Sequence, residues 1–262
     1  MKKLNFKNVI MCFVSILLFV SCLGKGPNII SGQAFGIVRY DYISGLMLLD
    51  INEYESLNNI RFQEATDGAC YWVYFEVDYD LPENNPEYVA SVGYYTVNII
   101  ERVQVNDWDM YDLSGTDTST VLTNEIPISD PFMEDQSSSY IKGMFFLSSL
   151  LTKYSDQEML WFLYCDFQNL DAEENHQEYY DLFMRTRVNS NSAKSTEKNA
   201  FTNAFNMGSF LEHVAHKERS LGNNAIKIRF NYVSAIDDDK ITWSHKDIEI
   251  EIDLIFPTEL NK

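Results

Sequence analysis

The sequence predicts an all-β protein with two domains. Short runs of β-forming residues recur along almost the whole chain, and the clearest of them alternate apolar and polar residues with a period of two. Helical spacing of apolar residues appears only over residues 209–217. Strands with one apolar and one polar face bury the first and leave the second in water. In chain order we expect a leader, a tether and two β domains.

The first 21 residues have the layout of a secretory signal peptide. Lys2, Lys3 and Lys7 give a positive start, and residues 9–20 form an almost unbroken apolar run. This run is shorter than the about 20 residues that a helix needs to cross a bilayer. A removable signal over residues 1–21 is therefore favoured over a permanent anchor.

The signal ends in FVSC, which resembles the lipobox of bacterial lipoproteins and makes Cys22 the predicted lipidation site. The alternative is ordinary cleavage at a small-x-small site, but Phe19 stands where the first small residue is needed. Several acyl chains would hold the protein to a membrane, because each buried CH₂ is worth about 0.8 kcal/mol. Residues 22–31 would then form a flexible, lipidated tether. No acidic cluster follows the cysteine, and we expect an outer-membrane lipoprotein of a Gram-negative bacterium that faces the periplasm.

The composition argues against some classes of partner. The chain has 39 Asp and Glu against 20 Lys and Arg, a net charge of −19, and it loses three lysines with the signal. Such a charge repels phosphate backbones and anionic headgroups, so we expect no nucleic-acid binding and no electrostatic docking to membranes. An envelope protein, a cationic peptide or a glycan remains compatible as a partner.

Residues 32–103 form the predicted first domain. Its strand candidates are residues 34–42, 46–51, 60–62, 70–79 and 94–100. Residues 81–87, which contain two prolines, are expected to be a loop. Five short strands in so short a stretch suit a small barrel of the OB type. A small sandwich fits nearly as well.

Residues 104–262 form the predicted second domain, a β-sandwich. The chain from residue 103 to about residue 139 is polar and is expected to be irregular, as are residues 189–199. A helix of one or two turns is expected at 209–217, and a turn at 237–239. The strand candidates are residues 140–151, 159–167, 179–188, 226–232 and 248–256.

Two cysteines remain once Cys12 leaves with the signal and Cys22 is acylated. They are Cys70 and Cys165. An oxidising compartment permits a disulfide between them. They lie in different predicted domains, however, so two buried free thiols are favoured over a bridge.

No catalytic residue, metal site or cofactor is expected. The hydrolase marker GxSxG is absent, and Ser209 with His213 is more often a helix cap beside a solvated side chain. His213 and His216 could share one helical face, but the sequence identifies no third metal ligand. The consecutive aspartates 237–239 do not match the alternating ligands of a calcium loop, so a solvated turn is favoured.

The candidate ligand-contact face lies on the strand over residues 70–79. Trp72, Tyr74, Glu76 and Asp78 point to the same side of this strand. An exposed barrel face with aromatic and acidic side chains could stack on a sugar or bind a basic peptide. The alternative, which we favour, is that the second domain covers this face.

The lipobox is followed by GQAFGIVRYDY at 32–42, CYWVYFEVDYD at 70–80, GYYTVNII at 93–100, YIKGMFFLSSLL at 140–151 and AIKIRFNYVSA at 225–235. Together these patterns resemble the NigD-like family of lipoproteins. The resemblance implies an N-terminal OB-like domain followed by a β-sandwich, and it brings no catalytic residues. The family name comes from association with a bacteriocin locus, which suggests an immunity function.

We therefore expect a membrane-anchored lipoprotein that acts as a non-enzymatic binding or accessory protein. Bacteriocin immunity is the alternative, because an acidic surface suits a cationic toxin. An envelope hydrolase comes third, because it would need a pocket with a pair of titratable groups that the sequence does not identify.

Overall fold

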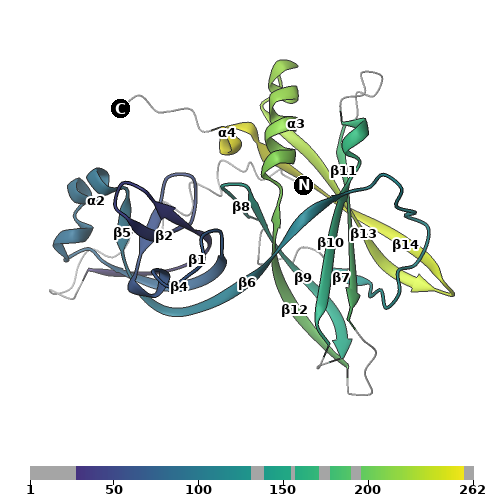
Figure 1. The fold of residues 1–262 in the computed structure, drawn as a ribbon, viewed down its shortest axis with the longest axis horizontal. Coiled ribbons are helices and arrows are strands. Elements are labelled where there is room, and N and C mark those ends of the chain that lie inside the picture. The colour runs from purple at the N-terminus through teal and green to yellow at the C-terminus, as the bar shows by residue number, and fades with distance from the viewer. Residues whose placement is uncertain (1–27, 131–138, 155–156, 171–177, 190–195, 257–262) are drawn as a thin grey trace, which may run out of the picture.

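The structure is a computed structural model that describes residues 28–130, 139–154, 157–170, 178–189 and 196–256. The predicted signal over residues 1–21 and Cys22 lie outside these residues. Figure 1 shows two lobes, with strands β1 to β5 in one, β7 to β14 in the other, and β6 running through both. The all-β class is confirmed. In the described part of the chain, no helix is both long and apolar enough to span a bilayer.

The first lobe is a small barrel. Its strands are β1 (Ile29–Asp41), β2 (Leu46–Asp50), β3 (Ser56–Asn58), β4 (Cys70–Asp78) and β5 (Tyr94–Thr96). The strand order is β6-β4-β1-β2-β3-β5, and β3 pairs with β5 in parallel. Since β5 leads into β6 after the single residue Val97, the sheet returns on itself and closes, as an OB barrel does.

The alternation of β4 fills this barrel. Tyr71, Val73, Phe75 and Val77 are buried in the barrel core, where they join Leu49 of β2 and other apolar side chains. This is the inward face expected from the period of two. The hairpin expected from residues 34–42 and 46–51 is present as β1 and β2.

Two local predictions in this domain are wrong. Residues Ile60–Phe62 form the 3-10 helix η2 instead of a strand, since the short strand that pairs with β2 and β5 is β3. Residues 81–87 contain the 3-10 helix η3 (Pro82–Asn84) and the start of helix α2 (Pro86–Val92). The α2 signals are Pro86 in its first turn and Asn85, whose side chain accepts a hydrogen bond from the Glu87 amide at 2.9 Å.

Strand β6 (Asn98–Asp112) has 15 residues and pairs in three places. It lies antiparallel to β4 up to Val105, then parallel to β12, then parallel to β10. Residues 103–112 are therefore a strand, and the prediction of irregular chain there is wrong. Most of the side chains of β6 are exposed, so its sequence lacks the alternation that marks a strand. The predicted domain boundary at 103/104 falls inside β6 and stays a prediction.

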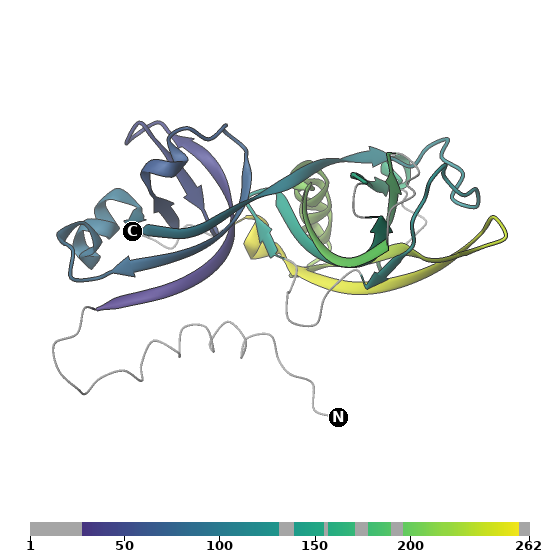
Figure 2. The ribbon, with the colours of Figure 1, turned by 90° about the horizontal axis from the view of Figure 1, so that it is seen from below.

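The second lobe has two sheets that share β6. One sheet contains β7 (Ile128–Asp130), β8 (Ser139–Ile141), β9 (Met144–Tyr154) and β12 (Thr196–Asn206). The other contains β10 (Met159–Cys165), β11 (Tyr180–Val188), β13 (Ala225–Asp237) and β14 (Lys240–Glu251). Figure 2 shows them on opposite sides of a common interior. Phe145 of β9 stacks on Phe230 of β13 at 5.3 Å between ring centroids, within one core.

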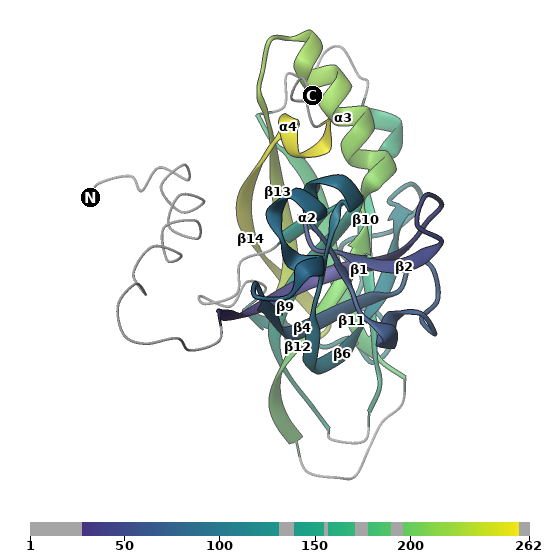
Figure 3. The ribbon, with the colours of Figure 1, turned by 90° about the vertical axis from the view of Figure 1, so that its left-hand side faces the viewer.

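Three helical elements complete this lobe: η4 (Phe167–Asn169), α3 (Gly208–Ser220) and α4 (Ile252–Ile255). Helix α3 has 13 residues and is longer than the one or two turns expected. The strand predicted over residues 248–256 ends at Glu251. This residue pairs with Ala225, the first residue of β13, so residues 252–255 do not continue the strand. In the described chain the ladder ends at that pair, the Ile252 amide still donates to the Asn224 carbonyl at 3.0 Å, and the chain then coils into α4. Figure 3 shows α3 and α4 together at one end of the lobe.

The prediction of a loop over 189–199 is wrong for its last four residues. Residues 196–199 belong to β12, which pairs with β9 over its whole length. Residues 190–195 lie outside the described chain. The run 140–151 is divided by a tight turn at Lys142 and Gly143, which have φ values of 42° and 95°. Two positive φ values in succession are typical of the hairpin turns that match the twist of β strands.

The irregular stretch between β6 and β7 is held by a buried arginine of β11. Arg185 makes two hydrogen bonds of 2.6 Å to the Glu125 carboxylate, and neither side chain is exposed. It also donates to the Thr120 carbonyl at 2.6 Å, and Trp243 donates to the Thr118 carbonyl at 3.2 Å. These bonds satisfy a charge that would be costly to bury alone.

The two lobes meet through the turn at Lys142. The Lys142 ammonium donates to Asp50 at 2.8 Å, and Arg39 donates to the Lys142 carbonyl at 2.7 Å. Asp50 is only 5% exposed and also accepts from Ser56 at 2.6 Å. Beside this polar contact, Phe35 of β1 stacks on Phe146 of β9 at 5.2 Å. An apolar cluster with members from both lobes surrounds these rings.

The two remaining cysteines are buried and free, as expected. Cys70 lies in the apolar cluster between the lobes, and Cys165 lies in the core of the second lobe. Burial raises the pKa of each thiol to about 12. Both therefore stay protonated and unreactive in the folded protein.

Replacing Lys142 tests the contact between the lobes. Lys142→Met removes the ammonium from a buried carboxylate and leaves Arg39 as a more distant partner, 3.8 Å from Asp50. We expect the free energy of unfolding in urea to fall by about 1–3 kcal/mol. Lys240→Met, at the exposed turn between β13 and β14, should stay within about 0.5 kcal/mol of the parent. Equal losses for the two variants would contradict this role.

Candidate functional site

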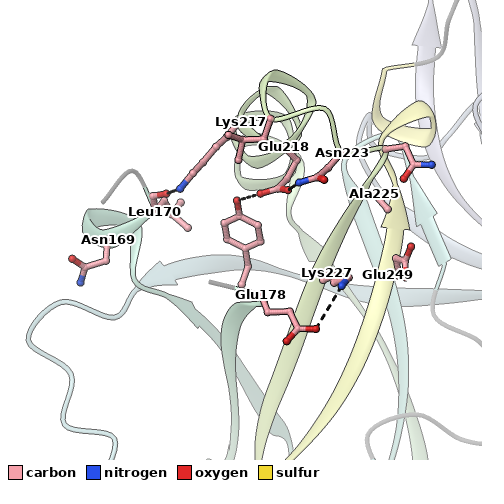
Figure 4. Close-up of a pocket in the computed structure, with 12 residues that line it drawn as sticks. Asn169, Leu170, Glu178, Lys217, Glu218, Asn223, Ala225, Lys227 and Glu249 are labelled. Carbon is pink, nitrogen blue, oxygen red and sulfur yellow. Dashed lines mark hydrogen bonds and ion pairs between the residues drawn. The ribbon is translucent and has the colours of Figure 1, made fainter. Parts of the chain in front are cut away.

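A polar pocket of about 330 Å³ lies between the end of α3, η4 and the first residues of β13 (Figure 4). Its lining includes Leu170, Tyr180, Lys217, Glu218, Asn223 and Lys227. These residues come from segments that are far apart in the sequence. Helix α3 forms its upper wall, and the strands of the second sheet form its floor.

Helix α3 is placed by its apolar stripe. Phe210, Leu211, Val214 and Ala215 are buried, at the spacing of one face of a helix. The helix begins where the Met207 amide donates to the Gly143 carbonyl at 2.9 Å, so its start is attached to the turn that also contacts the first lobe. With one face in the core, the polar side chains on another side of α3 line the pocket.

Glu218 accepts two side-chain hydrogen bonds in this pocket. Its Oε1 accepts a hydrogen bond of 2.5 Å from the Tyr180 hydroxyl, and its Oε2 accepts one of 2.6 Å from the Asn223 amide. Tyr180 is 7% exposed and makes an edge-to-face contact with Phe210, so the donor is fixed by packing. Within the described chain, Glu218 has no ion-pair partner. The pocket thus presents an oriented carboxylate held by two neutral donors.

The two lysines of the pocket already have partners. Lys217 donates to the Leu170 carbonyl, and its ammonium lies 5.9 Å from the centre of the Tyr180 ring. It thereby holds the chain after η4 against α3. Lys227 pairs with Glu178 at 3.6 Å on the rim. The exposed Glu249 stands opposite Lys227 in the ladder of β13 and β14, which adds a third carboxylate.

A smaller pocket of about 250 Å³ shares Leu170 with the polar pocket. It is lined by Phe167, Leu170, Ser209, Phe210 and His213, so its walls are mostly apolar. Ser209, His213 and Lys217 are four residues apart and occupy one side of α3. We call the two pockets together the α3 groove. It is polar at the end of the helix and apolar near its start.

The structure places the residues singled out in the sequence as follows. Ser209 and His213 are exposed and line the apolar pocket. His216 is exposed and lies against Phe256, with ring centroids 4.4 Å apart. Residues 237–239 lie at the turn between β13 and β14, with Asp238 and Asp239 at positive φ. No group of three or more His, Cys, Asp or Glu side chains in the described chain could hold a metal ion. Cys22 lies outside the described residues.

The face of Trp72, Tyr74, Glu76 and Asp78 is divided. Trp72 packs against the apolar cluster between the lobes. Tyr74, Glu76 and Asp78 lie further from the second lobe and are half-buried, and Glu76 accepts a hydrogen bond from Asn98 at 3.3 Å. A ligand-binding role for this face stays a prediction.

Tyr180 and Glu218, which organise the polar pocket, were not singled out in the sequence. They are 38 positions apart, and neither belongs to a motif with a fixed spacing. The helical spacing of residues 209–217 is the one signal that leads to this region. Even so, it predicts the apolar face of α3 and says nothing of the polar one.

Comparisons with known proteins give the fold a context. The model of a family described as Lipoprotein OB domain matches residues 26–104. An uncharacterised protein of Parabacteroides merdae is similar, with 18% identity, coverage of 84% of this chain and 99% of the other, and a TM-score of 0.68. A Bacteroides fragilis protein provisionally named a lipoprotein has 12% identity, 85% and 98% coverage, and a TM-score of 0.55. A search of curated proteins finds none that matches this chain.

A NigD-like immunity protein of Bacteroides caccae is a more distant match, with 12% identity, 84% and 94% coverage, and a TM-score of 0.45. The first two structures show that the whole two-lobe fold recurs. The matched OB domain supports the resemblance to a NigD-like lipoprotein family for the first lobe. At these identities, the comparisons with solved structures establish the fold alone.

Removing the Tyr180 hydroxyl tests the order of the polar pocket. Tyr180→Phe leaves Glu218 without one of its two donors, and we expect the free energy of unfolding to fall by about 1–3 kcal/mol. Tyr179→Phe is the matched control, because its ring lies under Arg229 and its hydroxyl makes no hydrogen bond within the described chain. Urea unfolding of both variants should separate them. A Tyr180 variant as stable as the Tyr179 variant would show that the network does not order the pocket.

Proposed function

We propose that the protein is an outer-membrane lipoprotein that faces the periplasm and acts as a non-enzymatic binding protein, with the α3 groove as its binding site. The oriented carboxylate of Glu218, held in a preformed pocket and without an ion-pair partner among the described residues, is the observation that carries this proposal. Preformed pockets with a few fixed polar groups are typical of ligand sites. The match of residues 26–104 to a lipoprotein OB domain supports the anchored class.

The anchor follows from the signal and from Cys22. Asn28, the first described residue, lies six positions after Cys22, so the two can be at most about 22 Å apart. An acylated Cys22 would therefore keep the barrel close to the membrane surface. The second lobe, which carries the α3 groove, would extend away from it or along it.

The second lobe is also the better candidate for binding because part of the barrel surface is already covered. OB barrels commonly bind ligands on the face of their second and third strands. Here the Lys142 turn contacts Asp50 of β2, which is hydrogen-bonded to Ser56 of β3. An external ligand would have to displace this contact.

Binding is favoured over catalysis because the side chains that hydrogen-bond Glu218, those of Tyr180 and Asn223, are uncharged donors. The lysines of the groove are bound elsewhere, and His213 lines its apolar pocket. Acid–base catalysis needs a second titratable group placed at the reacting atom. Bacteriocin immunity, raised by the sequence, would be a special case in which the ligand is a toxin.

Acylation of Cys22 can be tested by metabolic labelling. Cells given a clickable fatty acid should tag the wild-type protein, and Cys22→Ala should lose the tag because the acceptor thiol is gone. Cys165→Ala, which alters a buried thiol, is the control and should keep it. Equal labelling of the Cys22 variant and the parent would show that Cys22 is not the acylated residue.

The binding role can be tested by crosslinking in intact cells. Ala225 lines the polar pocket, so Ala225→Trp should fill it and abolish the capture of a specific partner. Ala90→Trp puts the same side chain on exposed α2 and should capture as the parent does. Mass spectrometry of the crosslinked material provides the measurement. A set of partners that is the same for both variants would contradict the assignment of the site.

A further inference from the structure

We infer that the ligand of the α3 groove is a short peptide segment with a basic and an apolar side chain two to four positions apart. The basic group pairs with Glu218 in the polar pocket, and the apolar group enters the pocket lined by Phe167, Leu170 and Phe210. This inference rests on the proposed function and names the class of its ligand.

The charge of the ligand follows from the hydrogen-bond acceptor positions of Glu218 that are open in the polar pocket. An ionised carboxylate has about four acceptor positions, and donors in the described part of the chain occupy one on each oxygen of Glu218. The remaining positions suit an ammonium or guanidinium group, whose charge-assisted hydrogen bonds are the stronger kind. Lys217 and Lys227 cannot fill this role in the structure, because they are bound to the Leu170 carbonyl and to Glu178.

The surroundings disfavour an anionic ligand. Glu178 and Glu249 add two carboxylates to the rim, against two lysines that already have partners. The chain as a whole has a net charge of −19, which would draw cationic segments toward it. The polar pocket therefore selects for positive charge both locally and at long range.

The apolar part of the ligand follows from the second pocket. Phe167 is 39% exposed, although it is a large aromatic side chain, and it forms one wall of this pocket beside Phe210 of α3. Burying a side chain the size of Leu or Phe there would contribute about 1.5–3 kcal/mol. Leu170 forms part of both pockets, so the apolar and cationic groups of one ligand would lie on either side of it.

The length of the groove favours a peptide over a small molecule. Ser209 lines the apolar pocket and Glu218 the polar one, nine residues further along α3. At the rise of an α-helix, this corresponds to about 14 Å. An extended peptide advances about 3.3 Å per residue, so about four residues cover the distance. A basic and an apolar residue two to four positions apart would therefore reach both pockets.

The probes are fluorescein-labelled peptides of seven residues in a Gly/Ser background. One carries a lysine and a phenylalanine three positions apart. Two matched peptides carry glutamate in place of the lysine, or alanine in place of the phenylalanine. Fluorescence anisotropy with the acylated, detergent-solubilised protein should show the first peptide binding at least tenfold more tightly than either of the others.

Variants then locate the binding. Glu218→Gln should weaken the first peptide about tenfold, and Phe167→Ala should weaken it several-fold. Glu64→Gln, an exposed residue of the barrel, removes the same charge elsewhere and should change nothing. Leu221 is 53% exposed at the rim of the polar pocket, so Leu221→Lys should fold normally, weaken the lysine peptide and strengthen the glutamate peptide.

The ligand class is overturned if the glutamate peptide binds as tightly as the lysine peptide, or if Glu218→Gln and Leu221→Lys both bind like Glu64→Gln. It is also overturned if no peptide binds while cellular capture still depends on Ala225. In that case the proposed binding function survives with a different ligand. If no peptide binds and Ala225→Trp also leaves the capture in cells unchanged, both the proposed binding function and its ligand class are contradicted.

Discussion

Strand β6 is the constraint on which the architecture depends. Its first half pairs with β4 and closes the barrel, and its second half pairs with β12 and β10 and so joins both sheets of the second lobe. A continuous strand cannot bend freely between its ladders, because each hydrogen-bonded pair fixes the direction of the next. The two lobes are thus joined through one continuous network of paired strands. The contacts around Lys142 and Phe146 add a second attachment beside it.

The connection between the lobes limits where a ligand can bind. The second attachment covers part of the outer surface of the barrel, at Asp50 and Ser56 and at Trp72. The same turn supports the start of α3, because the Gly143 carbonyl accepts the Met207 amide. Among the described residues, the α3 groove lies outside this contact and runs along that helix, with its fixed polar groups at the helix end. In this account the barrel provides the connection to the anchor, and the second lobe provides recognition.

The sequence predicts those elements whose burial alternates. Strand β4 and the first part of β13 each place one apolar face in a core, so their patterns identified them correctly. Strands β6 and β12 carry polar or exposed side chains over most of their length, and their partners decide that they are strands. Helix α4 begins because β14 runs out of a partner, which no local pattern reveals. The groove could not be predicted from the sequence for a similar reason, since Tyr180, Glu218 and Leu170 meet only in the folded chain.

The central claim is that recognition belongs to the α3 groove and not to the barrel. Hydrogen–deuterium exchange of the anchored protein, measured with and without its bound envelope partner, tests this most directly. The account predicts slower exchange over residues 167–170 and 209–223 on binding, with residues 46–58 unchanged. Slower exchange confined to residues 46–58 would place recognition on β2 and β3 and would contradict the account.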